Sequence, residues 1–309
     1  MGRHGVSKPA GATRPLMTPK DIVRAALVPV CWGFGYTMAK PAIDHFPPLF
    51  MVGITYLANF LVINALWPSR TSTPHWHVML VTSCVVTIQA ALGFYGYRHV
   101  SASLAILVVQ VQVPIAVLFG WWLLKEDLSP ARALGIAVAF AGVALVVGLP
   151  TQPPPWLPVA MLLTGAGVWG FGQVLVKKLS RDAGLPLLRA ISLHAVPQCL
   201  LASLLLEGGQ WEAIRSANAL QWAGFLSFSV VGFFCGYVLW YSVLSRNRID
   251  EVTPYVLLMP VVGVFAAVLV LGERPTAPNL IGGAIVMLGV AIVSGLRLPD
   301  RLRPKRVQR

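Results

Sequence analysis

Long apolar runs, separated by short clusters of Pro, Gly and charged residues, make up most of the chain from residue 20 onward. Each run has about 18 to 25 residues, the length at which an α-helix crosses a bilayer while satisfying its own backbone hydrogen bonds. A membrane β-barrel requires polar and apolar positions to alternate, and the runs do not alternate. The pattern predicts ten spanning helices, at residues 22–39, 48–67, 77–97, 102–124, 132–149, 157–176, 187–206, 220–244, 252–271 and 279–296.

The composition supports an integral membrane protein. Only 11% of the 309 residues are charged and 56% are hydrophobic, whereas a soluble domain has about 25% charged residues. A water-facing surface could not cover this much apolar material. Ten spans also leave room for loops and tails alone, which excludes a sizeable soluble domain.

Basic residues gather at the two ends of the chain and in alternate loops. The formal net charge is +13, but no polar domain carries a basic face with interleaved aromatic residues, which argues against nucleic-acid binding. With the N-terminus in the cytoplasm, most Lys and Arg lie on the cytoplasmic side, as in bacterial inner-membrane proteins. We therefore expect both termini to be cytoplasmic, with a disordered tail at residues 1–19 and a basic tail at residues 298–309. The cations left on the other side are Lys40, Arg98, Arg215 and Arg274.

An internal repeat divides the predicted spans into two halves, residues 20–149 and 157–297. The sequence Trp-Gly-Phe-Gly at residues 32–35 recurs at residues 169–172, and Lys40 recurs as Lys177 at the same spacing. The remaining matches, at a slightly larger spacing, are Glu126 with Glu273, Gly135 with Gly282, Pro114 with Pro260, and residues 142–144 with residues 289–291. Because each half has an odd number of spans, five, the second half is expected to be inverted in the membrane relative to the first.

The repeated segments resemble a known family. Residues 101–147 and 252–293, with Leu-Leu-Lys-Glu-Asp and Leu-Gly-Glu-Arg-Pro followed by Gly- and Ala-rich helices, are similar to the second parts of EamA-type halves. With the Trp-Gly openings, the resemblance covers residues 20–297 and indicates the drug/metabolite transporter superfamily. Within it, the chain is similar to the YddG-type exporters of aromatic amino acids. The resemblance implies export through a central cavity lined by the third, fourth, eighth and ninth spans, beside the first and sixth.

Polar and aromatic side chains inside the spans are the candidate substrate-binding residues, because each needs a partner or a ligand. Trp32, Tyr36 and Lys40 are four residues apart and share one helical face, and the sixth span repeats this spacing. Gln110 lies one turn before Pro114, while Gln112 is expected to point elsewhere. The full set is Trp32, Tyr36, Gln89, Gln110, Trp169, Gln173, His194, Tyr237 and Tyr255.

Each candidate also has a structural interpretation. The tryptophans could be packing or interfacial residues, and Tyr237 could anchor the chain at the membrane interface. The glutamines could hold helices together, and Lys40 and Lys177 could extend to lipid headgroups. His194 could titrate near neutral pH or make a structural hydrogen bond to a neighbouring helix.

Two further features bear on mechanism. Pro114 and Pro260 each lie inside a predicted span and are candidate hinges, or alternatively static kinks. No Asp or Glu lies in the middle of a span, which argues against proton coupling through a buried carboxylate and against a cationic drug as substrate. A lining of apolar, aromatic and amide side chains suits neutral amphipathic solutes such as zwitterionic amino acids.

The sequence therefore predicts an alternating-access exporter of neutral or aromatic amino acids, with efflux or exchange of drugs or other amphipathic metabolites as the alternative. The four cysteines lie in apolar runs without Cys-x-x-Cys spacing, and neither a metal site nor a cofactor is expected. A membrane enzyme would need a cluster of catalytic groups, and a channel a continuous polar pore. These classes and a scaffold are disfavoured, and no oligomer is required.

Overall fold

The computed structural model describes residues 17–126, 128–148, 155–182, 184–244, 246 and 255–294. Every regular element within these ranges is helical, which confirms an all-α protein. The predicted tails fall outside the described residues, apart from residues 17–19.

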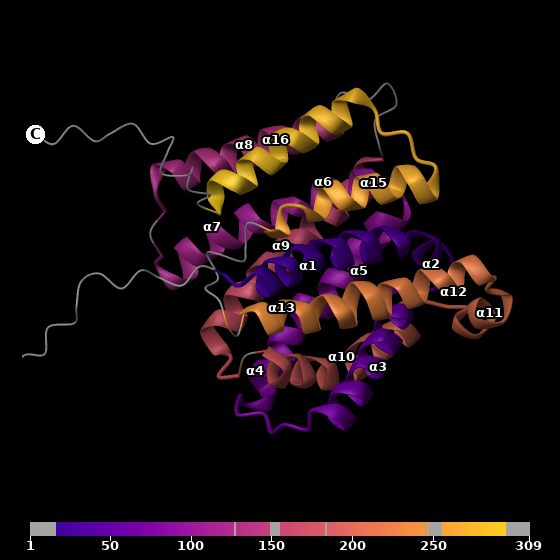
Figure 1. The fold of residues 1–309 in the computed structure, drawn as a ribbon. Coiled ribbons are helices and arrows are strands. Elements are labelled where there is room, and N and C mark those ends of the chain that lie inside the picture. The colour runs from indigo at the N-terminus through magenta and orange to yellow at the C-terminus, as the bar shows by residue number, and fades with distance from the viewer. Residues whose placement is uncertain are drawn as a thin grey trace, which may run out of the picture.

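The described chain forms a bundle of helices, several of them broken into shorter segments (Figure 1). The elements of the first half are α1 (Pro19–Met38), α2 (Lys40–His45), α3 (Pro48–Leu66), α4 (His75–Thr82), the π-helix η1 (Ser83–Ile88), α5 (Gln89–Arg98), α6 (Ala102–Val108), the 3-10 helix η2 (Val109–Val111), α7 (Gln112–Leu124) and α8 (Pro130–Gly148). Those of the second half are α9 (Trp156–Leu179), α10 (Gly184–Leu206), α11 (Gln210–Ser216), α12 (Ala219–Leu226), the π-helix η3 (Ser227–Cys235), α13 (Gly236–Leu244), α15 (Met259–Leu271) and α16 (Ala277–Val293).

Apolar length identifies this bundle as a multi-pass membrane protein. Seven helical stretches of the described chain are long and apolar enough to cross a bilayer, and each has 19 to 27 residues. Three shorter apolar helices, Pro130–Val146, Met259–Leu271 and Ala277–Val293, lie at the fifth, ninth and tenth predicted spans. Ten spans in inverted halves remain a prediction.

Helices of the two halves interlock. α8 packs along α16, α3 along α10, α5 along α9, and α1 along α15 and η3. Each of these pairings joins one half to the other, so neither half forms a separate body. In Figure 1, α1 begins and α16 ends at the same end of the bundle, on the left, while α2, α11 and α12 lie at the opposite end.

The closest crossings depend on glycine. A Cβ atom added to Gly35 on α1 would lie 2.3 Å from Cα of Gly232 on η3, and one added to Gly142 on α8 would lie 2.5 Å from the backbone nitrogen of Val286 on α16. Small residues at such crossings allow membrane helices to pack backbone to backbone, where van der Waals contact drives association. The repeated glycines of the sequence therefore hold the halves together.

Carboxylates fix several helix ends and loops. Glu207 accepts hydrogen bonds from the backbone nitrogens of Leu49 (2.8 Å) and Phe50 (3.1 Å) at the start of α3. After α9, Asp182 accepts hydrogen bonds from the backbone nitrogens of Ser72 (3.0 Å) and Thr73 (2.8 Å) and from the Thr73 hydroxyl (2.7 Å). Burial raises the pKa of Asp182, but these hydrogen bonds outweigh it, so the net pKa is below the ordinary 3.8.

Candidate functional site

A cavity of about 260 Å³ lies inside the bundle. Its wall combines Val256 and residues from α1, α3, α5, α7, α9, α13 and α15 with all three irregular segments, η1, η2 and η3. The third, fourth and eighth spans each contain one irregular segment, and the ninth has a turn at residues 257–258 before α15. Such departures from α-helical geometry are frequent at functional sites.

One part of the wall is aromatic. Trp32 and Tyr237 have ring centroids 5.5 Å apart, Phe233 lies 4.8 Å from Tyr237, and Tyr56 lies 4.7 Å from Phe233. These rings come from α1, α3, η3 and α13. Nε1 of Trp32 is buried and has no hydrogen-bond partner among the described residues. The aromatic wall therefore offers apolar faces, while the Nε1 donor of Trp32 packs against Gly236.

The other part of the wall carries amides. Gln89 begins α5, Gln110 lies in η2, and Gln112 begins α7. Gln110 is only 2% exposed, and its Oε1 has no hydrogen-bond partner in the described chain. A buried amide oxygen without a partner costs about 1 to 3 kcal/mol. Gln110 therefore lines the cavity with this amide oxygen buried in the wall, and a ligand reaches the acceptor only after the wall rearranges.

None of the described residues that line the cavity is an Asp, Glu, Lys, Arg or His. A ligand with a net charge would lose hydration there without gaining an opposite charge. A solute with no net charge, which combines a polar group with an apolar body, fits this wall.

Aromatic packing closes the cavity on the side of Lys40. Tyr36 belongs to the wall, and Tyr97 stacks directly behind it with ring centroids 4.7 Å apart. The Tyr97 hydroxyl donates a hydrogen bond to the backbone oxygen of Tyr36 (3.0 Å). Nζ of Lys40 lies 5.5 Å from the centre of the Tyr97 ring, which is fully buried. A solute could leave on this side only after these rings separate.

The structure brings six of the nine candidate residues to one cavity: Trp32, Tyr36, Gln89, Gln110, Trp169 and Tyr237. The other three do not line it. Gln173 lies one turn beyond Trp169, His194 contacts His75 (Nε2 to Nδ1, 3.1 Å), and Tyr255 packs on the small cluster of Ala25 and Val243. His194 thus makes the hydrogen bond to a neighbouring helix that was the structural alternative for this residue.

The expectation for Gln112 was wrong, because Gln112 is part of the cavity wall. The cause is η2, which rotates the chain by about 120° per residue instead of about 100° and brings Gln112 closer to the face of Gln110. Tyr56, Phe94 and Phe233 are wall residues that the sequence did not single out. Tyr56 was detectable as an aromatic hydroxyl within an apolar span, whereas no sequence signal separates the two phenylalanines from packing residues.

The candidate hinges lie at these irregular segments. Pro114 is buried in the first turn of α7, directly after η2, and Pro260 is buried in the first turn of α15, after the turn at residues 257–258. Both prolines thus follow a break in their span beside the cavity, and Gln110, Gln112 and Met259 of the wall border those breaks.

Comparison with known proteins identifies the family. The EamA-like transporter family matches the chain twice, over residues 20–148 and 156–295. The chain belongs to this family. It is therefore a transporter of the drug/metabolite transporter superfamily by descent, as its motifs indicated.

Relatives match along nearly the whole EamA-like chain. A protein of Escherichia coli named "Probable amino-acid metabolite efflux pump" is 30% identical, with coverage of 91% of this chain and 97% of the relative. Its namesake in Salmonella typhimurium is 29% identical with the same coverage. The uncharacterized transporter YvbV of Bacillus subtilis is 24% identical, and the alignment covers 87% of this chain and 90% of the relative. A solved structure with 17% identity has the same fold, with a TM-score of 0.64, and covers 90% of this chain and 99% of its own.

Proposed function

We propose that this EamA-like transporter exports amino acids, or neutral amphipathic metabolites of similar size, across a bacterial-type inner membrane. The observation that carries the proposal is the uncharged cavity, whose wall combines aromatic rings with amides and holds the buried Nε1 of Trp32 and Oε1 of Gln110, which have no partner among the described residues. A zwitterion has a donor in its ammonium group and an acceptor in its carboxylate, and it has no net charge. The names of the relatives in Escherichia coli and Salmonella typhimurium support the same class of substrate.

The shape of the cavity favours a small ligand with an aromatic or apolar side chain. Its volume of about 260 Å³ is below the range of about 300 to 1,000 Å³ that is typical of sites for drug-sized molecules. The rings of Trp32, Tyr56 and Tyr237 provide faces for an apolar or aromatic side chain, and the amides of Gln89, Gln110 and Gln112 provide donors and acceptors. Drug efflux is the second candidate, because aromatic walls also accept such solutes.

Transport is proposed to follow alternating access. Two five-span halves with opposite orientation could exchange their conformations and so expose the cavity first to the cytoplasm and then to the other side. The breaks before Pro114 and Pro260 are the proposed hinges. We propose, from the distribution of Lys and Arg, that both termini are cytoplasmic. The absence of charged residues from the described cavity wall favours movement down a gradient, or exchange, over proton coupling.

Counterflow in proteoliposomes tests the function. Vesicles loaded with unlabelled phenylalanine or threonine are expected to accumulate the labelled amino acid transiently and with saturation. Gln110→Leu and Trp32→Phe should each reduce this uptake by about tenfold, since each removes one hydrogen bond of about 1 to 2 kcal/mol that we expect the wall to make to the solute once the wall rearranges around it.

Matched variants control for stability. Asn279 is 8% exposed and also has a buried oxygen without a partner in the described chain, but it is outside the cavity wall. Trp156 is 77% exposed. Asn279→Leu and Trp156→Phe should leave counterflow unchanged. Uptake that does not saturate would indicate a channel, and counterflow of drugs but not of amino acids would transfer the proposal to the second candidate.

A further inference from the structure

Two pairs of repeated charged residues make different contacts at the two ends of the bundle. Lys40 corresponds to Lys177, and Glu126 corresponds to Glu273. Lys40 and Glu273 lie at the end that contains α2, and Lys177 and Glu126 lie where α9 and α7 end. The repeat therefore does not impose the same contacts on the two pairs of residues.

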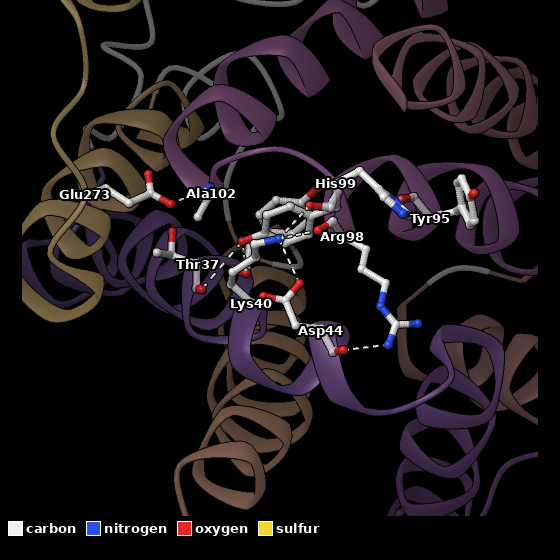
Figure 2. Close-up of polar contacts among 10 residues, drawn as sticks. Thr37, Lys40, Asp44, Tyr95, Arg98, His99, Ala102 and Glu273 are labelled. Atoms are coloured by element: carbon white, nitrogen blue, oxygen red, sulfur yellow. Dashed lines mark hydrogen bonds and ion pairs between the residues drawn. The ribbon is translucent and has the colours of Figure 1, made fainter. Parts of the chain in front are cut away.

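At the Lys40 end, the lysine holds the C-terminus of α5. Its Nζ donates hydrogen bonds to the backbone oxygens of Tyr97 (3.0 Å) and Arg98 (2.7 Å) and to the carboxylate of Asp44 (2.8 Å) (Figure 2). The side chain of Lys40 is 16% exposed. A cation is favourable at a helix C-terminus, where unpaired carbonyl groups concentrate partial negative charge.

At the same end, Glu273 holds the N-terminus of α6. Its two oxygens accept hydrogen bonds from the backbone nitrogens of Ala102 (2.6 Å) and Ser103 (2.9 Å), and Figure 2 shows the carboxylate directed at Ala102. A carboxylate is favourable at a helix N-terminus for the opposite electrostatic reason. Lys40 and Glu273 therefore bind the two sides of the turn that joins α5 to α6. Glu273 belongs to the other half of the chain.

At the opposite end, the corresponding residues bond to each other. Nζ of Lys177 contacts Oε1 of Glu126 as a direct ion pair. The side chains of Lys177 and Glu126 are 67% and 39% exposed, and within the described residues neither makes a second side-chain contact to a helix end. This pair joins α9 of the second half to the segment after α7 of the first half.

We propose that these four residues form two exchangeable gates, which rests on the alternating access proposed above. At the closed end, the lysine and the glutamate separate and hold helix termini; at the other end, they pair with each other. When the transporter changes conformation the two ends exchange these contacts, so that Lys40 pairs with Glu273 while Lys177 and Glu126 hold helix termini on their own side.

The exchange keeps every charge compensated. A lysine or glutamate that leaves a helix terminus loses its hydrogen bonds to the backbone, and at the open end, where both side chains are exposed, the ion pair and water replace them. Here each released group meets the opposite charge released beside it. The free energies of the two conformations can therefore stay similar, as alternation requires, because neither arrangement leaves an uncompensated ion.

Two double variants, each of which exchanges the charges of one lysine–glutamate pair, distinguish the proposed gates from static ion pairs. Lys177→Glu with Glu126→Lys preserves the ion pair but places the wrong charge at helix termini when that end closes. Lys40→Glu with Glu273→Lys has the opposite consequence. It preserves the Lys40–Glu273 ion pair proposed for the other conformation, but it reverses the charges that hold the ends of α5 and α6 in the present one. The two exchanges should therefore shift the conformational equilibrium in opposite directions.

A cysteine at Thr37 reports that equilibrium. Thr37 is fully buried one turn before Lys40, and its hydroxyl donates to the backbone oxygen of Gly263 (3.1 Å). With Cys31, Cys84, Cys199 and Cys235 replaced, Thr37→Cys in lipid nanodiscs should react with maleimide only when the Lys40 end opens. The Lys177/Glu126 exchange is expected to slow labelling roughly fivefold and the Lys40/Glu273 exchange to accelerate it by a similar factor.

The Lys177/Glu126 exchange decides the proposal. Unfolding would accelerate labelling, so slower labelling cannot arise from a damaged protein. Unchanged or faster labelling in this variant would overturn the proposal. A control exchange, Lys178→Glu with Glu212→Lys, alters two exposed residues whose side chains make no ion pair in the described chain, and it should not change labelling. Labelling requires no substrate, so the gates can be tested even if no amino acid is transported.

Discussion

The two ends of the bundle carry the same repeated residues and differ in how tightly they are closed. At the Lys40 end, Tyr97 is fully buried and stacks on Tyr36, and the lysine itself is 16% exposed. At the other end, Lys177 is 67% exposed, and the side chain of Gln173, one turn from it toward the cavity wall at Trp169, makes no hydrogen bond in the described chain. A repeat thus duplicates residues without duplicating contacts, which is the difference that the proposed alternation would produce.

Removal of the buried ring should show the largest difference between the ends. Tyr97→Ala is expected to lower the free energy of unfolding by about 3 to 5 kcal/mol, since a fully buried aromatic side chain is replaced by a cavity. Trp122→Ala near the other end removes a ring that is 59% exposed and should cost less than about 1 kcal/mol. Denaturant unfolding in detergent measures both. Equal losses would mean that the two ends are packed alike.

The two repeated glutamates should differ by a smaller amount. Glu273→Ala removes hydrogen bonds to two backbone nitrogens of α6 and is expected to cost about 1 to 2 kcal/mol. Glu126→Ala removes one exposed ion pair and should cost about 0 to 1 kcal/mol. The same unfolding experiment, with 1 M salt added, should reduce only the effect of Glu126→Ala, because salt screens exposed charges. A larger loss for Glu126 would reverse the comparison.

The smallest effect concerns the hydrogen bonds that Asp182 accepts from Ser72 and Thr73. They show that the Lys177 end also contains a loop held by side-chain hydrogen bonds. Because the pKa of Asp182 is lowered in the folded protein, its stabilising contribution is present above the ordinary carboxyl pKa of about 4 and is lost as the pH falls through the lower folded value. Asp182→Asn should lose about 1 kcal/mol at pH 7 and respond less to acid below pH 4. Thermal unfolding of both proteins between pH 7 and pH 3 tests this. An undiminished acid response in Asp182→Asn would assign it to other carboxylates.

Local helical spacing predicted part of the candidate site. Trp32 and Tyr36 share a face of one regular α-helix, and both reach the cavity wall. Gln112 was misplaced because the 3-10 segment η2 changes the rotation per residue, which no polar or apolar pattern in the sequence announces. Gln173 has the spacing of a wall residue but lies beyond the cavity, because the extent of a cavity depends on the neighbouring helices.

The sequence alone determined that the chain is helical, membrane-embedded and internally repeated. These properties follow from the length of apolar runs and from residue spacing, which act within one helix and its lipid surroundings. The tertiary structure decided which side chains meet: the amides and rings around one cavity, the pairing of His75 with His194, and the unequal bonding of Lys40 and Lys177. Such contacts join residues far apart in the chain, and their formation depends on how the helices pack rather than on any local preference.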